Sequence, residues 1–379
     1  MNEKTKRIIN WAKGRPQPPV TIELVPTNRC NFNCPSCWRQ DCSSEDKEKK
    51  FEDEISDERL MKLTDEAASL GVRDIAFVGG GEPLMREITF ELIKRIKRHG
   101  MEGDLVTNGS LLTEEMIQTL VRIKWDRIKF SVDGSNAKLQ DKLRGVKCYE
   151  KVMSNIKRLS EFKKIYRSNK PRLSFNTVIS SENYKDLPKI IELGKKTGID
   201  EIMLLPLTVF SKEGEKLKMS KKQAIEFQGI IGKCLPLLKK YDIASNMENF
   251  IVDADYLQKT NAMDEVMMQE SGKYSIKDKK NKLDNFISMP CFEPWTHVTI
   301  LPNGNIASCF NNYVWETKVS IRNHSLKELW YGRYFDKFRD EILTGKLSKA
   351  CATCCIWRLF EVQDIRKEME DYLNSCPEK

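Results

Sequence analysis

Three cysteines within eight residues carry the most evident chemistry of this sequence. Cys30, Cys34 and Cys37 lie in the stretch RCNFNCPSCWR at residues 29–39, and no fourth cysteine follows at a matching spacing. A structural zinc site is closed by four ligands, and each of the four irons of a [4Fe-4S] cluster needs one ligand. Three thiolates therefore predict a cluster with one open iron, or a zinc site with a distant fourth ligand.

A second group of cysteines lies near the end of the chain. It consists of Cys291, Cys309 and the pair Cys351-x2-Cys354, which together can complete a tetrahedral set for zinc or for a cluster. Cys355 can replace Cys354, although the spacing favours Cys354. The remaining cysteines have no partner in a motif, and buried unligated cysteine is the usual state of such residues; they are Cys42, Cys148, Cys234 and Cys376.

The elements around these cysteines follow a repeated pattern. From residue 20 to 207, short β-rich runs alternate with longer amphipathic stretches, which predicts βα units and a parallel sheet. The predicted strands are VTIELVP, DIAFVGG, GDLVTNG, RIKFSVDG, RLSFNTVI and EIMLLPL, with helices at 57–70, 185–197 and 220–240. The first cysteine motif follows the first strand, at the end where such sheets collect their ligands.

The chain divides by pattern into four segments. We expect an N-terminal extension at 1–19, an α/β core at 20–240, a linker or bridging segment at 241–286, and a small α+β domain at 287–379. The last segment opens with HVTILPNGNIASCF, which predicts a hairpin around Pro302-Asn303-Gly304-Asn305, and continues with two helices flanking the late cysteines.

Composition narrows the class of protein. With 379 residues, 40% apolar and 31% charged, the chain is typical of a soluble globular protein, and no apolar run is long enough to span a membrane. We expect a cytoplasmic protein, in which clustered cysteines indicate metal rather than disulfides. The net charge of +9 is dispersed without an aromatic-basic stripe, which disfavours a nucleic-acid substrate. With three histidines in the chain, no histidine cluster is predicted.

The segment CNFNCPSC resembles the signature of the radical S-adenosylmethionine (radical SAM) superfamily. The resemblance implies a partial (β/α)6 TIM-like barrel and a [4Fe-4S] cluster held by Cys30, Cys34 and Cys37. The fourth iron would bind S-adenosyl-L-methionine through its amine and carboxylate. The cleavage of that cofactor to a 5'-deoxyadenosyl radical is chemistry that the protein positions rather than performs.

Further segments are similar to cofactor-binding segments of the same family. GGGEP at 79–83 resembles the Gly-Gly-Glu motif, which implies that Gly80, Gly81 and Glu82 bind the ammonium group of the cofactor; the alternative is a simple tight turn. VTNG and FSVDG are similar to segments that line the adenosyl pocket, which implies contacts from Asn108 and Ser131.

Two details of the resemblance leave alternatives open. Arg144 in LRGV can pair with the methionine carboxylate or lie on the surface, and Asp133 can simply cap a turn. Many relatives have an aromatic residue directly before the third cysteine, whereas this chain has Ser36 there and Trp38 after it. That departure puts adenine stacking at this point in doubt.

The late cysteines, with Gly304 and SLKELW between them, resemble a shortened SPASM region called a Twitch domain. The resemblance implies one auxiliary [4Fe-4S] cluster bound by Cys291, Cys309, Cys351 and Cys354. A full SPASM pattern would continue with more cysteines, where this chain has CIWRLFEVQ.

The resemblance implies an enzyme that abstracts a hydrogen atom from a small molecule or a peptide and oxidises it, by dehydrogenation or crosslinking, with an electron donor such as flavodoxin or ferredoxin. One alternative is a redox-neutral epimerase, for which Cys148 is a candidate hydrogen donor. The alternative of another class is a non-enzymatic zinc or iron-sulfur protein, against which GGGEP and the six βα units argue. The catalytic acid or base is not identified by the sequence.

Overall fold

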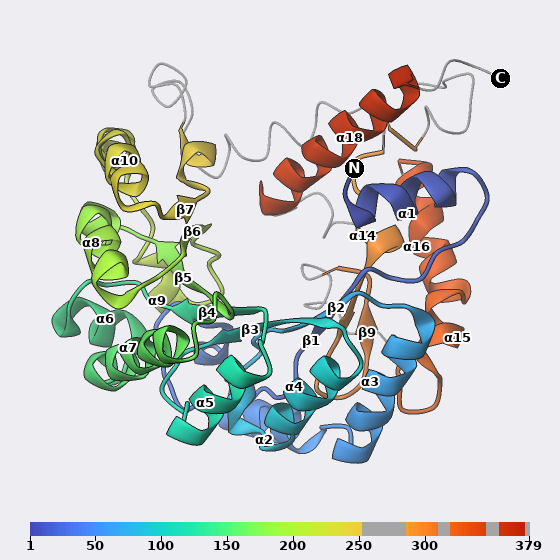
Figure 1. Ribbon diagram of the computed structural model, residues 1–379, viewed down its shortest axis with the longest axis horizontal. Helices are drawn as coiled ribbons and strands as arrows, with labels where there is room; N and C mark the ends of the chain where they lie inside the picture. The colour runs from blue at the N-terminus through green and yellow to red at the C-terminus, as the bar shows by residue number, and fades with distance from the viewer. Residues whose placement is uncertain (252–285, 288, 310–318, 346–355, 376–379) are drawn as a thin grey trace. The chain divides into compact units, whose positions relative to one another are not determined.

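The computed structural model describes residues 1–251, 286–287, 289–309, 319–345 and 356–375 (Figure 1). The chain forms two compact units. Unit 1 comprises Met1–Leu24, Ile55–Ala76 and Asp264–Lys379, and unit 2 comprises Val25–Glu54 and Phe77–Met263. In this division residues 21–24, which lie in the first predicted strand, group with the C-terminal part of the chain. The predicted domain boundaries stay a prediction.

Unit 2 is built on a sheet with the strand order β3-β4-β5-β6-β7, in which neighbouring strands are parallel. The strands are β3 (Glu102–Thr107), β4 (Arg127–Ser131), β5 (Arg172–Ile179), β6 (Glu201–Pro206) and β7 (Ala244–Ser245). The first four were predicted from the sequence, whereas β7 was not. It is too short to give a periodic signal.

The helices of unit 2 connect these strands and line their outer side (Figure 1). They are α2 (Ser44–Glu52), α4 (Ile88–Arg98), α5 (Glu114–Arg122), α6 (Ala137–Arg144), α7 (Tyr149–Ile165), α8 (Leu187–Thr197), α9 (Lys212–Glu215) and α10 (Lys221–Tyr241), with short 3-10 turns η1 (Trp38–Gln40), η2 (Pro83–Met85), η3 (Tyr184–Asp186) and η4 (Met247–Phe250). The expected helices at 185–197 and 220–240 correspond to α8 and α10.

The two faces of the strands in unit 2 differ, because side chains alternate along a strand. Phe130, Phe175 and Ile202 are fully buried in one row on the helix side, where Gly194 of α8 packs near Ile202. The opposite, inner face carries Ser131 and Asn176 in the adjacent row. The inner face is therefore the one that can be used for binding.

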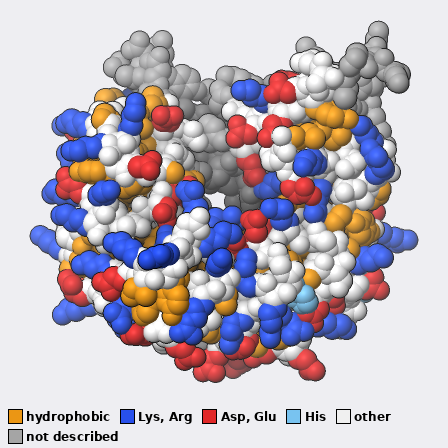
Figure 2. Space-filling model, viewed as in Figure 1, with side chains coloured by type: hydrophobic (Ala, Val, Ile, Leu, Met, Phe, Trp, Pro, Cys, Tyr) orange, Lys and Arg blue, Asp and Glu red, His pale blue; other side chains and the backbone are white. Residues whose placement is uncertain are grey.

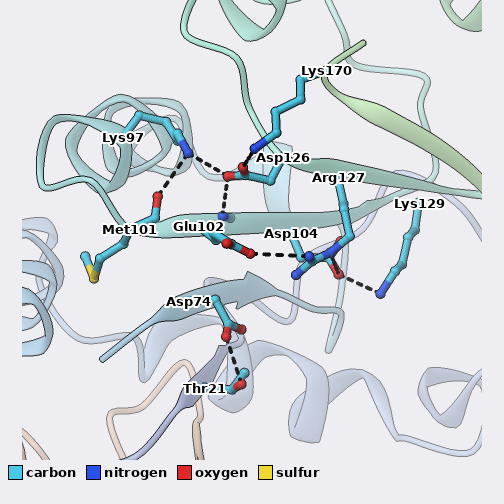
Figure 3. A network of polar contacts seen from close by, with 11 residues as sticks. Thr21, Asp74, Lys97, Met101, Glu102, Asp104, Asp126, Arg127, Lys129 and Lys170 are labelled. Atoms are coloured by element: carbon cyan, nitrogen blue, oxygen red, sulfur yellow. Dashed lines mark hydrogen bonds and ion pairs between the residues drawn. The ribbon is translucent and has the colours of Figure 1, made fainter. Parts of the chain in front are cut away.

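The N-terminal ends of these strands are joined by ion pairs (Figure 3). Asp126, just before β4, accepts from Lys97 Nζ at 2.6 Å, from Lys170 Nζ at 2.5 Å and from the Gly103 amide at 2.9 Å. Hydrogen bonds from both lysines and from Gly103 outweigh the effect of burial and lower the pKa of Asp126. This end of the sheet is held by a carboxylate with three donors.

Unit 1 contains the strands in the order β2-β1-β8-β9. They are β1 (Thr21–Leu24), β2 (Asp74–Phe77), β8 (His297–Ile300) and β9 (Ile306–Ala307), where β1 and β8 are parallel and β8 and β9 antiparallel. The predicted hairpin is confirmed, since Gly304 makes its turn at φ +81°. His297 is buried on β8, and its Nε2 lies 3.2 Å from Glu23 Oε2 on β1.

The helices of unit 1 are α1 (Glu3–Ala12), α3 (Asp57–Leu70), α14 (Glu293–Thr296), α15 (Leu326–Trp330), α16 (Arg333–Leu343) and α18 (Ile356–Ser375). The expected helix at 57–70 is α3. Of the two helices expected to flank the late cysteines, the first, over SLKELWYGRYFDKFRDEIL, is formed as α15 and α16, because the helix breaks at Gly332. A Cβ at Gly332 would lie 2.5 Å from the Glu328 carbonyl oxygen, so a larger residue would not fit this break.

No helix in the described part of the chain is long and apolar enough to cross a membrane. Figure 2 shows lysine and arginine side chains interspersed with aspartate and glutamate over the visible face. The dispersed charge expected from the sequence is thus visible at the surface.

Candidate active site at the C-terminal ends of the strands

The loop that follows β1 carries the first three cysteines of the predicted cluster. Cys30, Cys34 and Cys37 are half-buried, and none of them forms a disulfide. The Phe32 amide donates to Cys30 Sγ at 3.4 Å, and the Cys37 amide donates to the Cys34 carbonyl at 3.1 Å. Burial raises the pKa of Cys30 and of Cys37, so both are thiols until a metal displaces their protons.

The arrangement of the thiols bears on the kind of metal. Among the described residues, no three His, Cys, Asp or Glu side chains are grouped so that they could hold one metal ion. A cluster of four irons does not require such a group, because each thiolate binds a different iron. Three thiols on one loop are compatible with such a cluster, and the ligand set stays a prediction.

The glycine loop after β2 packs directly on the cysteine loop. The Gly81 amide donates to the Thr27 carbonyl at 2.9 Å, and the Glu82 amide donates to the Arg29 carbonyl at 2.8 Å. A Cβ at Gly81 would lie 2.0 Å from the Arg29 carbonyl oxygen. Gly81 is required here for the close approach of two backbones, a reason more specific than the simple turn left open by the sequence.

Trp38 adds a side-chain link between the same two loops. Its indole Nε1 donates to the Gly80 carbonyl at 2.9 Å. The ammonium of Lys50 lies 5.0 Å from the centre of the Trp38 ring, within the range of a cation–π contact. Trp38, the aromatic residue after the third cysteine, thus links the cysteine loop to the glycine loop. Sequence spacing alone gave no signal for it.

Glu82 lies at the predicted place, and its surroundings are unusual for a carboxylate. It is 2% exposed and accepts hydrogen bonds from Thr107 Oγ1 at 2.7 Å, the Asn108 amide at 2.7 Å and the Leu84 amide at 3.3 Å. In the part of the chain that the structure describes, no lysine or arginine forms an ion pair with it. Burial raises the pKa of Glu82 to about 7, although the three hydrogen bonds act in the opposite direction.

Asn108, at the end of β3, connects that strand to the cysteine loop. Its Nδ2 donates to Asn31 Oδ1 at 2.8 Å, and its Oδ1 accepts from the Ser110 hydroxyl at 2.8 Å. The structure therefore brings Asn108 to the predicted site but uses both ends of its side chain within the protein. A contact with the cofactor stays a prediction.

Arg144 is half-buried, with 12% of its side chain exposed, and its contact with a carboxylate of the cofactor stays a prediction. Its Nη2 lies 2.6 Å from Asp133 Oδ2, and its carbonyl accepts from the Asn33 amide at 3.2 Å. Burial alone would lower the pKa of Arg144, but the carboxylate of Asp133 and the nearby Cys34 raise it. Gly145 follows at φ +65°, and a Cβ there would lie 2.1 Å from the Asn33 carbonyl oxygen.

The ion pair also explains Asp133, which was expected either at the adenosyl pocket or at a turn. Asp133 is buried, and its Oδ1 accepts from the Val178 amide at 2.8 Å. Asp133 therefore links the end of β4 to β5 and fixes Arg144 beneath the cysteine loop. The pairing was not predicted, because nothing in the spacing distinguishes it from a surface arginine.

Cys148 lies at the start of α7, near Arg144. It is 5% exposed, and burial together with the Asp141 carboxylate raises its pKa to about 12. Cys148 is therefore a thiol at neutral pH, and its role as a hydrogen donor stays a prediction.

Unit 1 holds the described part of the second cysteine group. The Glu293 amide donates to Cys291 Sγ at 3.4 Å, the same local turn that surrounds Cys30, and Cys309 follows β9. An amide donor at the sulfur is a feature that tunes iron-sulfur ligands. Cys351, Cys354, Cys355 and Cys376 lie outside the described residues, so the choice between Cys354 and Cys355 stays open.

Comparison with known protein families identifies both parts of the chain. Residues 24–194 match the radical SAM superfamily, and residues 291–355 match an iron-sulfur cluster-binding domain, the SPASM domain. The chain carries a radical SAM domain and a SPASM domain. The expected open, partial α/β barrel with a C-terminal SPASM-type domain is confirmed. A radical SAM domain binds a [4Fe-4S] cluster and S-adenosylmethionine, and a SPASM domain binds auxiliary iron-sulfur clusters.

Curated relatives of this radical SAM chain have different named activities. It is 29% identical over 196 residues to the tungsten-containing aldehyde ferredoxin oxidoreductase cofactor-modifying protein of Pyrococcus furiosus, covering 49% of this chain and 52% of the relative. It is 31% identical over 181 residues to the AdoMet-dependent heme synthase of Methanosarcina barkeri (48% of each). It is 31% identical over 182 residues to the PqqA peptide cyclase of Granulibacter bethesdensis (48% of this chain, 46% of the relative). The chain spans about half the length of these relatives.

Solved structures share the fold over more of the chain. Streptococcus suis SuiB bound to its precursor peptide SuiA has a TM-score of 0.62 at 15% identity, covering 88% of this chain and 70% of SuiB. The anSMEcpe structure with bound AdoMet and the Cp18Cys peptide has a TM-score of 0.58 at 17% identity, covering 90% and 88%. At these identities the likeness shows the fold alone.

Proposed function

We propose that the protein reductively cleaves S-adenosylmethionine and abstracts a hydrogen atom from its substrate, which it then oxidises. The observation that carries the proposal is Glu82, a buried carboxylate without a cationic partner among the described residues, at the end of the sheet next to the cysteine loop. A buried carboxylate in this state gains most from a ligand that brings a positive charge.

The residues around Glu82 fit the two cofactors. When bound, the cluster and S-adenosylmethionine supply the cleavage of a carbon–sulfur bond and the resulting 5'-deoxyadenosyl radical. Cys30, Cys34 and Cys37 would hold the cluster. Glu82 and the Gly80 and Gly81 backbone would bind the ammonium of the methionine part.

We propose that Arg144 pairs with the methionine carboxylate through the guanidinium nitrogens that Asp133 does not bind. Nη2 is held by Asp133, while Nε is buried without a hydrogen-bond partner among the described residues. A guanidinium has five N–H donors, so the pair with Asp133 leaves donors for a second carboxylate. Asp133 would then act as a positioning residue.

We propose that the substrate is a small molecule or a peptide and that the modification is oxidative. One relative is named a heme synthase and another a peptide cyclase, which supports both classes of substrate, and the SuiB structure contains a precursor peptide. A single auxiliary cluster ligated by Cys291, Cys309, Cys351 and Cys354 would accept the electron of the oxidised substrate. A soluble electron donor of the flavodoxin or ferredoxin type would reduce the first cluster, and we place the protein in the cytoplasm.

The test is iron and acid-labile sulfide content, with EPR, on protein purified anaerobically and treated with dithionite and S-adenosylmethionine. The proposal predicts about eight irons in the parent and about four in a Cys30→Ala, Cys34→Ala, Cys37→Ala variant, with 5'-deoxyadenosine formed by the parent alone. Zinc without iron, or intact clusters without 5'-deoxyadenosine, would contradict it. With a substrate in hand, an oxidised product loses mass, whereas an epimer keeps the mass and gains a solvent hydrogen.

A further inference from the structure

A buried arginine binds the segment of unit 1 that leads to Cys291. Arg366 of α18 is 8% exposed. Its Nε donates to the Ile287 carbonyl at 3.1 Å, and its Nη2 donates to the Met289 carbonyl. These two carbonyls lie four and two residues before Cys291 in the sequence. One guanidinium therefore fixes the backbone on the N-terminal side of this cysteine.

A second buried arginine binds the segment that follows Cys291. Arg339 of α16 is 4% exposed, and its Nε donates to the Pro294 carbonyl at 3.0 Å, three residues after the cysteine. Its guanidinium carbon Cζ lies 4.5, 4.7 and 5.3 Å from the centres of three aromatic rings, those of Trp11, Trp330 and Phe335. Contacts of this kind hold a cation in place. The two arginines thus fix the backbone on both sides of Cys291.

Both guanidiniums bring positive charge into unit 1. Burial lowers the pKa of Arg339 to about 10, so this group is still protonated at pH 7. Its ion pair is with Asp336 at 3.2 Å, a side chain that is 60% exposed and therefore screened by water. The Nη2 of Arg339 is buried and has no hydrogen-bond partner among the described residues. The charge of Arg339 is thus balanced only in part by the protein.

An iron-sulfur cluster held by four thiolates is the kind of group that such charges suit. Its net charge is negative and becomes more negative on reduction, and its reduction potential depends on the charges and hydrogen bonds around it. Consecutive Cα atoms are 3.8 Å apart, so the Cα of Met289 lies at most about 8 Å from that of Cys291. Buried positive charge at this range stabilises the reduced cluster more than the oxidised one.

We propose that Arg339 and Arg366 are positioning residues for the auxiliary cluster, which hold the backbone around Cys291 and raise the reduction potential of the cluster. This inference rests on the proposed function, because it requires the auxiliary cluster at Cys291. A raised potential makes the cluster a better electron acceptor, which is the task proposed for it.

The test is a redox titration of the full chain with both clusters, kept anaerobic and followed by EPR. The auxiliary signal is the one that persists when Cys30, Cys34 and Cys37 are replaced by alanine. Arg366→Gln and Arg339→Gln each keep a donor for a carbonyl and remove the charge. At the midpoint potential of the parent, each should lower the ratio of reduced to oxidised auxiliary cluster about tenfold, a shift of about 59 mV to more negative potential.

Two further variants separate the charge from a general effect on the fold. Arg366→Lys keeps the charge and should return the ratio close to that of the parent. Arg7→Gln is the matched control, because Arg7 is also buried and binds backbone carbonyls far in sequence from any cysteine of this group. It donates to the carbonyls of Pro18, Pro19 and Gly71 at 3.1, 2.8 and 2.9 Å. Arg7→Gln should lower stability and leave the potential unchanged.

An auxiliary cluster that keeps its irons and its potential in both Arg366→Gln and Arg339→Gln would overturn the inference. An equal shift in Arg7→Gln would overturn it as well. Loss of the auxiliary irons alone in one glutamine variant would support the positioning of Cys291, and the potential is then measured in the other. If Arg366→Gln does not fold, Arg339→Gln carries the same test, because it gives up one carbonyl contact instead of two.

The failure of the inference and that of the proposed function are distinguishable. A parent with about four irons instead of eight has no auxiliary cluster, which overturns the inference together with that part of the proposed function. A parent that has both clusters and forms 5'-deoxyadenosine, with a potential that the variants do not move, overturns the assignment of the two arginines alone. Intact clusters without 5'-deoxyadenosine contradict the proposed function, while the shift in potential is still measured.

Discussion

The two ends of the sheet in unit 2 use buried carboxylates in opposite ways. At the N-terminal ends, Asp126 has two lysines and an amide as donors, and its pKa is lowered (Figure 3). At the C-terminal ends, Glu82 has only neutral donors, and its pKa is raised to about 7. The first carboxylate is satisfied by the protein. The charge of Glu82 is left to be balanced by a ligand. The N-terminal ends of the strands therefore serve stability, and the C-terminal ends serve binding.

The largest effect is expected at the close contact between the glycine and cysteine loops. Gly81→Ala would place a Cβ 2.0 Å from the Arg29 carbonyl oxygen, so one loop has to move. We expect loss of most of the cluster bound by that loop and a loss of about 2–4 kcal/mol in the free energy of unfolding. Iron content and urea unfolding measure the two effects.

Gly229→Ala in α10 is the control, since a Cβ there meets no atom within 4 Å. It should stabilise the helix by about 0.5–1 kcal/mol and leave the iron content unchanged. An intact cluster in Gly81→Ala would show that the two backbones do not need this contact.

The next effect tests the binding end of the comparison. In Glu82→Gln the carboxylate that would meet the ammonium is replaced by a neutral amide. Affinity for S-adenosylmethionine should fall by about tenfold to a hundredfold, because hydrogen bonds to charged groups contribute about 1.5–3 kcal/mol. Equilibrium dialysis measures this, and affinity equal to that of the parent would remove Glu82 from the site.

Asp126→Asn should give the reverse pattern. The amide keeps the shape but leaves Lys97, which is 18% exposed, beside a neutral group. We expect the free energy of unfolding to fall by about 2–3 kcal/mol at pH 7, with affinity for S-adenosylmethionine unchanged. Equal losses of stability in Asp126→Asn and Glu82→Gln, with equal effects on binding, would abolish the distinction between the two ends.

The dependence on pH sharpens the same comparison with a smaller effect. The pKa of Glu82 in the folded protein is about 7, above its ordinary value, so the stability that it contributes is full at low pH and falls as pH rises through 7. Its ionised form binds an ammonium, so affinity for S-adenosylmethionine should rise with pH up to about 7 and then level off. The pKa of Asp126 is lowered, and the stability it contributes is lost only as pH falls below its ordinary value of about 3.9. Binding measured from pH 6 to 8, in the parent and in Glu82→Gln, checks the first curve; a rise that persists in the variant would assign it to another group.

The smallest effect is expected at Cys148. If the reaction is oxidative, Cys148→Ala should leave the product and its mass unchanged, since the thiol has no part in removing two hydrogens. Mass spectrometry of the product in deuterated solvent measures this. Loss of a solvent-derived hydrogen in Cys148→Ala would instead support the epimerase.

The parts of this site that the sequence predicted are those carried by local motifs. The strand ends, the cysteine loop, Glu82 and Ser131 each follow a short pattern at a fixed place in a βα unit, so their location did not require knowledge of tertiary contacts. The pair of Arg144 and Asp133 was missed because two charged residues eleven positions apart give the same signal whether they meet or face solvent.

The links between the cysteine loop and its neighbours have a consequence for how the cluster is acquired. The loop is fixed by backbone contacts to Gly81, Glu82 and Arg144 and by side-chain contacts to Gly80 and Asn108. Each link reduces the conformational freedom of the loop. The three cysteines therefore lose their conformational entropy when the sheet folds and not when iron binds. The cluster is then inserted into a preorganised loop. The rate of insertion should depend on the supply of iron and sulfide more than on any rearrangement of the protein.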